Sequence, residues 1–201
     1  MPTRGYTAGR GARTLAPPSC RRNAMLSDTR STQHPRSPPM SPNDLLAGGY
    51  RMGRQMVHMM AGDLTATEFT CQPVAGANSA AWIVGHLAVT ARRTAERLGA
   101  IELPLLTEAF IGKYSVTRKP ADDQSELDDK AELLRLLDAC VDQLLGALGT
   151  LPPESLANPP ANPGPFATNY GEAVLFGAMH FAMHCGQLST IRRSLGKPPL
   201  M

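Results

Sequence analysis

Residues 180–198, HFAMHCGQLSTIRRSLGKP, combine the pattern of a buried helix face with a pair of histidines. Apolar residues recur here at helical spacing, and they are Phe181, Ala182, Met183, Leu188 and Ile191. His180 and His184 are four residues apart, which places two side chains on one side of a helix with Cβ atoms about 5–6 Å apart. Such a pair either binds one divalent cation through ring nitrogens or consists of two ordinary histidines of a helical protein.

Four segments of the chain show a helical period of apolar residues. We predict helices over 42–61, 78–99, 125–149 and 169–195. Each start offers side chains that can accept the first free backbone amides. The candidate caps are Ser41 or Asn43, Asn78 or Ser79, Ser125 with Asp128 as a capping box, and Thr168 or Asn169. Gly99 and Gly196 stand where two of the helices end, and glycine there commonly adopts a left-handed conformation.

The segments between these helices are predicted to be loops, because none sustains an apolar period. They are 63–77, 100–124 and 150–168, and the last holds six prolines between 152 and 165. Four amphipathic helices without a strand-like segment predict an all-α protein, with a four-helix bundle in residues 41–201. The connection 100–124 is long enough to cross the bundle, so the helices that flank it run either parallel or as a hairpin.

Residues 1–40 differ from the rest in composition and charge. They hold six prolines, seven arginines and one acidic residue, a charge of +6, so the remaining residues carry −3 of the total +3. Such a segment cannot bury enough apolar surface to offset its ordering entropy, and we expect it to be disordered. It is an organelle transit peptide, a nucleic-acid-binding arm, or residues upstream of a true start at Met40.

The composition excludes several classes for the predicted bundle. Its mildly acidic charge gives no basic face for nucleic acid. The sequence contains no run of 18 apolar residues, so no membrane-spanning helix is predicted. It also contains no glycine-rich turn of the kind that binds a dinucleotide or, in a Walker-type loop, a phosphate. The scattered cysteines, with no CxxC pair, indicate free thiols in a reducing compartment, and we expect a cytoplasmic protein. They are Cys20, Cys71, Cys140 and Cys185.

A metal site at His180 and His184 needs a third ligand from elsewhere in the chain. The candidates are His86 and His58, since His34 lies in the segment expected to be disordered. His86 is the better candidate, because it stands in AAWIVGHLAV, where an imidazole among apolar residues costs burial energy unless its nitrogens find partners. His58, in QMVHMM, is free to face solvent beside Arg54.

Two blocks of the chain resemble the DinB/YfiT-like superfamily. NSAAWIVGHLAV, residues 78–89, is similar to that family's second-helix pattern, in which an apolar helix that begins at Asn carries His followed by Leu. Residues 180–198 look like its fourth-helix pattern, HxxxHxGQ followed by RxLG. The order and separation of the blocks also agree, and the resemblance extends over about residues 42–198.

The resemblance implies a four-helix bundle with a divalent metal held by His86, His180 and His184. Imidazole ligands suit zinc, nickel, iron, copper or manganese, and the sequence does not choose among them. Family members include S-transferases that use low-molecular-weight thiols such as bacillithiol or mycothiol, and others are similar to maleylpyruvate isomerase. A small-molecule substrate is therefore implied, and a homodimer is possible. Because ligating histidines are neutral, metal binding is expected to fail as the pH drops through about 6.

Four residues near the expected site have two interpretations each. Gln187 either orients a ligand or a bound water, or is a polar residue at a helix seam. Cys185, about 100° around the helix from His184, is a small buried residue or a redox-sensitive thiol, but not a ligand of the same metal. Gly186 costs a helix about 1 kcal/mol relative to Ala, which close approach of a neighbouring helix or a substrate would explain. Trp82 is either a core residue, the simpler interpretation, or stacks on a substrate.

Three functions remain open at this point. The first is a metal-dependent enzyme, a thiol-dependent transferase or a hydrolase, in which the metal activates a thiol or water. The second is a non-catalytic metal-binding protein of the stress response, or an interaction module, with a closed site that gains a fourth ligand such as His58. The third is a helical bundle whose buried histidines bind no metal.

The composition of residues 1–40 generates a first prediction. A chain that starts at Met40 should unfold at the same thermal midpoint as the full chain, because the deleted residues carry no core-forming pattern. Differential scanning calorimetry of both chains tests this. A midpoint lower by several degrees would mean that the deleted segment packs on the bundle.

Overall fold

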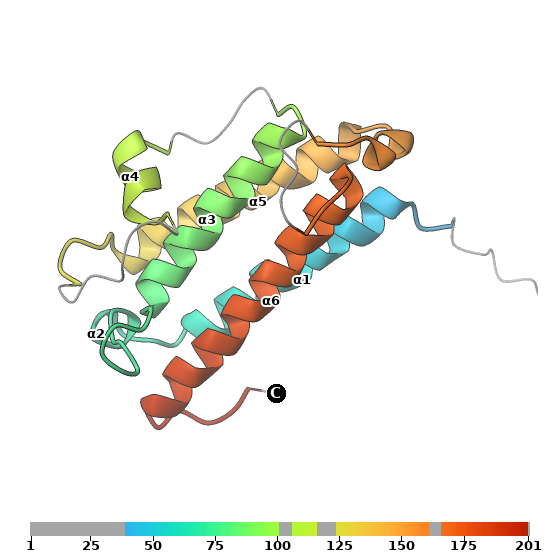
Figure 1. Ribbon diagram of the computed structural model, residues 1–201. Coiled ribbons are helices and arrows are strands. Elements are labelled where there is room, and N and C mark those ends of the chain that lie inside the picture. Colours follow the sequence, from blue (N-terminus) through green and yellow to red (C-terminus); the bar gives the residue numbers. More distant parts are fainter. Residues whose placement is uncertain (1–38, 101–105, 116–123, 161–165, 201) are drawn as a thin grey trace, which may run out of the picture. The chain divides into compact units, whose positions relative to one another are not determined.

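The computed structural model describes residues 39–100, 106–115, 124–160 and 166–200. The prediction that the N-terminal segment is disordered concerns residues that, up to residue 38, lie outside the described part of the chain. Four long helices form the predicted bundle (Figure 1). They are α1 (Pro42–Ala61), α3 (Ala80–Arg97), α5 (Lys130–Thr150) and α6 (Tyr170–Ser194). No strand occurs in the part of the chain that the structure describes. The prediction of an all-α bundle is therefore confirmed.

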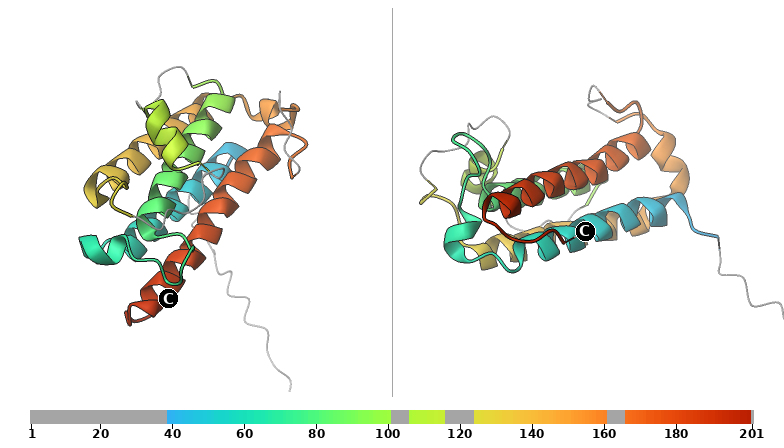
Figure 2. Two further views of the ribbon diagram at one scale, coloured as in Figure 1. Left: turned by 60° about the vertical axis from the view of Figure 1, so that its left-hand side comes forward. Right: turned by 90° about the horizontal axis from the view of Figure 1, so that it is seen from below.

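The helices pack as a ring in which each contacts two neighbours: α1 contacts α5 and α6, and α3 contacts the same two. Figures 1 and 2 show that α3 and α5 run in the same direction, while α1 and α6 run together in the opposite one. Of the two arrangements that the sequence left open for the helices around residues 100–124, the parallel one is correct. Because that connection crosses the length of the bundle, it can place residues against α3.

Short helices occupy parts of the connections that we predicted to be loops. They are α2 (Ala66–Phe69), α4 (Glu108–Lys113) and the 3₁₀ helix η1 (Pro153–Ala157). The side chain of Thr65 caps α2 and that of Thr107 caps α4. None of the three is long enough to show a helical period in the sequence, which is why the pattern missed them.

The predicted ends of the long helices are mostly correct, with one exception. Ser41, Ser79 and Asn169 cap α1, α3 and α6 through their side chains. We predicted that the third long helix starts after Ser125, but α5 begins at Lys130 and Asp129 caps it.

Tertiary contacts explain this later start of α5. The predicted capping box needed Asp128, whose carboxylate instead accepts hydrogen bonds from Lys113 Nζ at 3.0 Å and Tyr114 Oη at 2.8 Å. At the other ends of the helices, Gly99 and Gly196 have φ angles of 83° and 72°, in the left-handed conformation predicted for them.

Helix α3 is the most buried element of the bundle. Between Ala80 and Val89 every one of its residues is buried, whereas the other long helices keep a solvent side. Tyr114, at the end of α4, covers part of α3 that the neighbouring helices leave open, and its ring packs where a Cβ on Gly85 would stand. His86 is buried because it belongs to this enclosed stretch.

Glycines set the spacing between α1 and α6, but Gly186 is not among them. A Cβ on Gly53 would stand 2.8 Å from the Cβ of Phe181, and one on Gly49 would stand 3.1 Å from the Cβ of Ala178. At Gly186, by contrast, a Cβ would meet no atom within 4 Å. Of the two explanations that we gave for Gly186, close approach of a neighbouring helix within the chain is therefore wrong.

This difference predicts opposite effects of the same substitution. Gly186→Ala should stabilise the protein by about 1 kcal/mol, because alanine favours the helix and nothing crowds its methyl group. Gly53→Ala should destabilise it by about 1–3 kcal/mol, because Phe181 Cβ cannot move without α6. Urea unfolding of the three proteins measures both changes. Equal effects would contradict this account of the two sites.

Candidate metal centre

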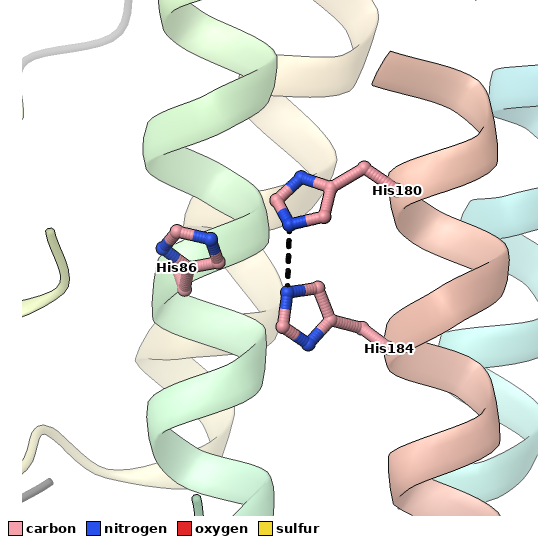
Figure 3. Close-up of side chains that lie close together, drawn as sticks. All are labelled: His86, His180 and His184. Carbon is pink, nitrogen blue, oxygen red and sulfur yellow. Dashed lines mark hydrogen bonds between the residues drawn. The ribbon is translucent and has the colours of Figure 1, made fainter. Parts of the chain in front are cut away.

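Three histidines converge between α3 and α6 (Figure 3). One ring nitrogen of His86, one of His180 and one of His184 all lie within 4.8 Å of one another. The Nε2 atoms of His180 and His184 are 2.9 Å apart, and the ring of His86 is 5.1 Å from each of theirs, centroid to centroid. The three residues that the sequence singled out are therefore brought together in space.

His86 is oriented by the connection that crosses the bundle. Its Nδ1 donates a hydrogen bond of 2.8 Å to the backbone carbonyl of Tyr114. A carbonyl only accepts, so Nδ1 carries the proton and Nε2 keeps its free electron pair. Trp82, one turn earlier on α3, stacks on the imidazole with ring centroids 4.6 Å apart and planes 10° apart. The ring of His86 is thus fixed in both tilt and tautomer.

His184 is oriented by Gln187, as one of the two interpretations of that residue predicted. Its Nδ1 lies 2.9 Å from Gln187 Oε1, an acceptor, so Nδ1 again carries the proton. Its Nε2 is then the acceptor in the contact with His180, whose Nε2 donates. For all three rings to ligate through Nε2, the proton on His180 has to move to Nδ1 of that ring.

This donor set fits a divalent transition metal. Imidazole nitrogens that bind one ion at about 2.1 Å are about 3 to 3.4 Å apart. The His180–His184 pair has nearly this spacing, and His86 lies within reach of it. A histidine that ligates a metal through Nε2 usually donates a hydrogen bond from Nδ1–H to a nearby acceptor. No carboxylate or thiol joins the group in the part of the chain described by the structure.

Comparisons with known proteins bear on the family and the fold of this chain. A family model described as the DinB superfamily matches residues 50–188, which include all three histidines. The chain belongs to the DinB superfamily. A crystal structure of a protein described as the conserved protein of locus from Enterococcus faecalis is similar in fold, with a TM-score of 0.62 at 18% identity. The match covers 79% of this chain and 100% of that one. None of the curated proteins matches the chain.

Burial keeps the histidines of this DinB protein neutral. Burial and the neighbouring His86 lower the pKa of His180 to about 4, and burial together with both neighbours lowers that of His184 to about 4. The pKa of His86 is lowered as well, chiefly by burial. Protonation that would compete with a metal, expected near pH 6 for ordinary histidines, therefore moves toward about pH 4 at His180 and His184.

The other candidates lie outside the group. His58 contacts Asp138, with Nε2 and Oδ1 2.8 Å apart, and does not supply a fourth ligand. Cys185 is buried and its pKa is raised to about 11 by burial, so it is a small neutral core residue rather than a reactive thiol.

Sequence reasoning missed the role of Tyr114, which acts through its backbone. Any residue has a carbonyl, so no side chain in the sequence signals this contact. Phe176 and Phe166 were missed too. Their rings stack 5.2 Å apart, and Phe176 lies 6.4 Å from the ring of His180 with planes 12° apart. A row of aromatic rings thus leads from the exposed Phe166 to one of the histidines.

The lowered pKa values predict how the metal-free protein responds to acid. Its free energy of unfolding should fall by on the order of 2 kcal/mol between about pH 6.5 and pH 4, because the unfolded chain binds protons that the buried imidazoles do not. Urea unfolding of chelator-treated protein across this range measures the change. His180→Gln removes one of these groups and should flatten the profile. Identical profiles for both proteins would contradict the prediction.

Proposed function

We propose that this DinB protein is a divalent-metal-dependent enzyme that transfers a group between a small molecule and a thiol or water. The observation that carries the proposal is the convergence of three imidazoles on one point. In two of them, His86 and His184, the Nδ1–H group already donates a hydrogen bond to another residue, which leaves Nε2 free. Histidines that were buried without binding a metal would have no reason to direct their Nε2 atoms toward one point. Three protein ligands also leave coordination positions open, as a catalytic site requires.

The donor set favours nucleophilic chemistry. A divalent ion held by His86, His180 and His184 would keep its full positive charge, because the three ligands are neutral, and would lower the pKa of a bound thiol or water. The protein residues orient and desolvate the site: Tyr114 and Gln187 hold two of the rings, and Trp82 covers one face of His86. With no carboxylate in the group among the described residues, activation at the ion rather than a carboxylate base is the basis of the mechanism.

The surroundings of His180 support a substrate with an apolar or aromatic part. Phe166 and Phe176 are 70% and 39% exposed, and Met183, on the same side of α6, is 60% exposed. An aromatic stack that ends on a ligand can hold a flat substrate against the ion. A low-molecular-weight thiol would be the second reactant of an S-transferase, and a reducing, cytoplasmic location would suit it.

A non-catalytic role is the second candidate. Leu175, Met179 and Met183 form an exposed apolar row along α6, with 50%, 55% and 60% of each residue accessible. Such a row favours a homodimer or another protein partner over an isolated chain. In this case the metal would stabilise the bundle instead of activating a substrate.

The proposal predicts metal content and activity together. Protein purified without a histidine tag should contain about one divalent transition metal per chain by elemental analysis, and His180→Ala should contain much less. Gln187→Ala should lower metal affinity about 10- to 100-fold, because Gln187 fixes the ring of His184. The metal-loaded protein should turn over at least one electrophile in a panel offered with several low-molecular-weight thiols and with water, and chelation should abolish this turnover.

His58→Ala is the matched control, since this histidine lies outside the group and should leave the metal content unchanged. Equal, substoichiometric metal in His180→Ala and the unmodified protein would exclude the metal site. Turnover that survives complete metal removal would exclude the mechanism. Metal binding without turnover on any pair of reactants would favour the non-catalytic role.

A further inference from the structure

The exposed side of α6 carries a long stripe without charges between its two ends. Residues 173–191 contain no Asp, Glu, Lys or Arg. At 100° per residue, eight exposed residues of α6 lie within an arc of about 100°. They are Glu172, Leu175, Met179, Ala182, Met183, Gly186, Thr190 and Arg193. His180 lies about 100° around the helix from Met179, so the stripe is separate from the metal centre.

The apolar surface continues onto α1. Three exposed residues stand seven apart on one side of that helix: Leu45, Met52 and Met59. Met56, on the same side, lines a groove of about 360 Å³ together with Ala182 and Gly186 of α6. The exposed sides of the two helices therefore adjoin, and we call them together the α1–α6 face. A contiguous apolar surface of this kind is rare on an isolated chain and marks a contact with something else.

The two ends of the α6 stripe indicate what covers this face. Glu172 stands at one end and Arg193 at the other, about 32 Å apart along the helix. A membrane surface favours helices whose apolar side is bordered by basic residues, and an acidic end does not suit it. Opposite charges at the two ends fit a second copy of α6 that runs in the opposite direction, because each acid then lies opposite a base.

A two-fold axis between residues 182 and 183 produces this pairing. The axis lies midway between Glu172 and Arg193, so each faces the partner's copy of the other, and such a self-complementary contact closes as a dimer. Ala182 and Met183 then lie beside the axis, each next to its own copy. The centre of the contact is therefore apolar, with an alanine that lets the helices approach and a methionine that adapts its shape.

The same axis pairs large side chains with small ones. Met179 comes opposite the partner's Gly186, where a Cβ would meet no atom of its own chain within 4 Å. The groove beside that glycine has room for the methionine side chain. Leu175 comes opposite the partner's Thr190, which is smaller. The register that pairs the end charges is thus also one in which the side chains between them fit.

We propose that the α1–α6 face is the interface of a homodimer in which two α6 helices pack antiparallel about this axis. Its footprint, about 30 Å along the helices and about 20 Å across them, is on the order of 600 Å². This is comparable with the roughly 800 Å² of accessible surface that a stable interface buries on each partner. The inference does not rest on the metal centre or on the proposed activity.

Sedimentation velocity of the full chain over a dilution series tests the dimer. The unmodified protein should sediment with the mass of two chains, with or without a chelator. Met183→Glu should weaken the dimer at least about 100-fold, because it brings two carboxylates together in an apolar contact, and Met183→Leu should not. Ala131→Glu is the control, since it adds a carboxylate to an exposed position of α5, across the bundle from α6. Circular dichroism shows whether each variant keeps its helices.

Cross-linking through introduced cysteines tests the register without disturbing the apolar contact. With a short bismaleimide, Ala182→Cys should link two chains, because its copies lie beside the axis. Leu175→Cys should not link to itself, since its copies lie about 22 Å apart along the helices. Co-expressed with Thr190→Cys, it should form a linked pair. The unmodified chain reports any linkage through the native cysteines.

Several outcomes would overturn the proposal. A monomer at every concentration would exclude the dimer, and a monomer that binds phosphatidylcholine vesicles would assign the face to a membrane. A dimer that Met183→Glu leaves intact would have another interface. Linkage of Leu175→Cys to itself would mean that the two helices run parallel.

Discussion

The packing of Tyr114 on α3 is the contact on which the histidine group depends. The Tyr114 ring takes the space that a side chain on Gly85 would need, and this close approach brings the Tyr114 carbonyl to Nδ1 of His86. The same tyrosine binds Asp128 through its hydroxyl, which ties the crossing connection to the start of α5. One residue therefore links the enclosure of α3, the tautomer of His86 and the point at which α5 begins.

Burying three imidazoles side by side works against their protonation. Desolvation disfavours the charged form and is the main cause of the lowered pKa values of all three rings. Repulsion from neighbouring histidines adds to it at His180 and His184, and the charge of Arg93 adds to it at His86. At His86 and His184 the neutral ring has an engaged Nδ1 and is prepared for ligation before any ion arrives, whereas His180 has first to move its proton from Nε2 to Nδ1. The bundle thus supplies the protonation state and the orientation, and the aromatic row at Phe176 supplies a surface beside them.

Helix α6 carries the histidine pair on one side and packs against α1 on the other. His180 and His184 face α3, whereas Gly53 and Gly49 of α1 allow the close approach of Phe181 and Ala178. Arg192 holds this arrangement at the C-terminal end, since its ion pair with Asp63 and its bond to the Met60 carbonyl join α6 to the end of α1. A change in the packing of α6 against α1 would therefore reach the histidine pair through one rigid element.

The sequence by itself determined the features that depend on neighbours in the chain. Helical periods, side-chain caps such as Ser79 and the glycine ends act within a few residues, and the four long helices follow from them. The HxxxH spacing likewise placed His180 and His184 on one side of α6. For the third member, apolar surroundings favoured His86 over His58, and the family resemblance agreed with that choice.

Tertiary structure alone decided the rest, because the deciding partners lie far apart in the chain. The hydrogen-bond partner of His86 is a backbone carbonyl. Every residue has a carbonyl, so the sequence gives no sign of this contact. Asp128 is drawn to Lys113 and Tyr114, so the cap of α5 falls on Asp129 instead of the predicted box. Whether a helix glycine allows close packing, as Gly53 does, or stands beside open space, as Gly186 does, depends only on what lies opposite it.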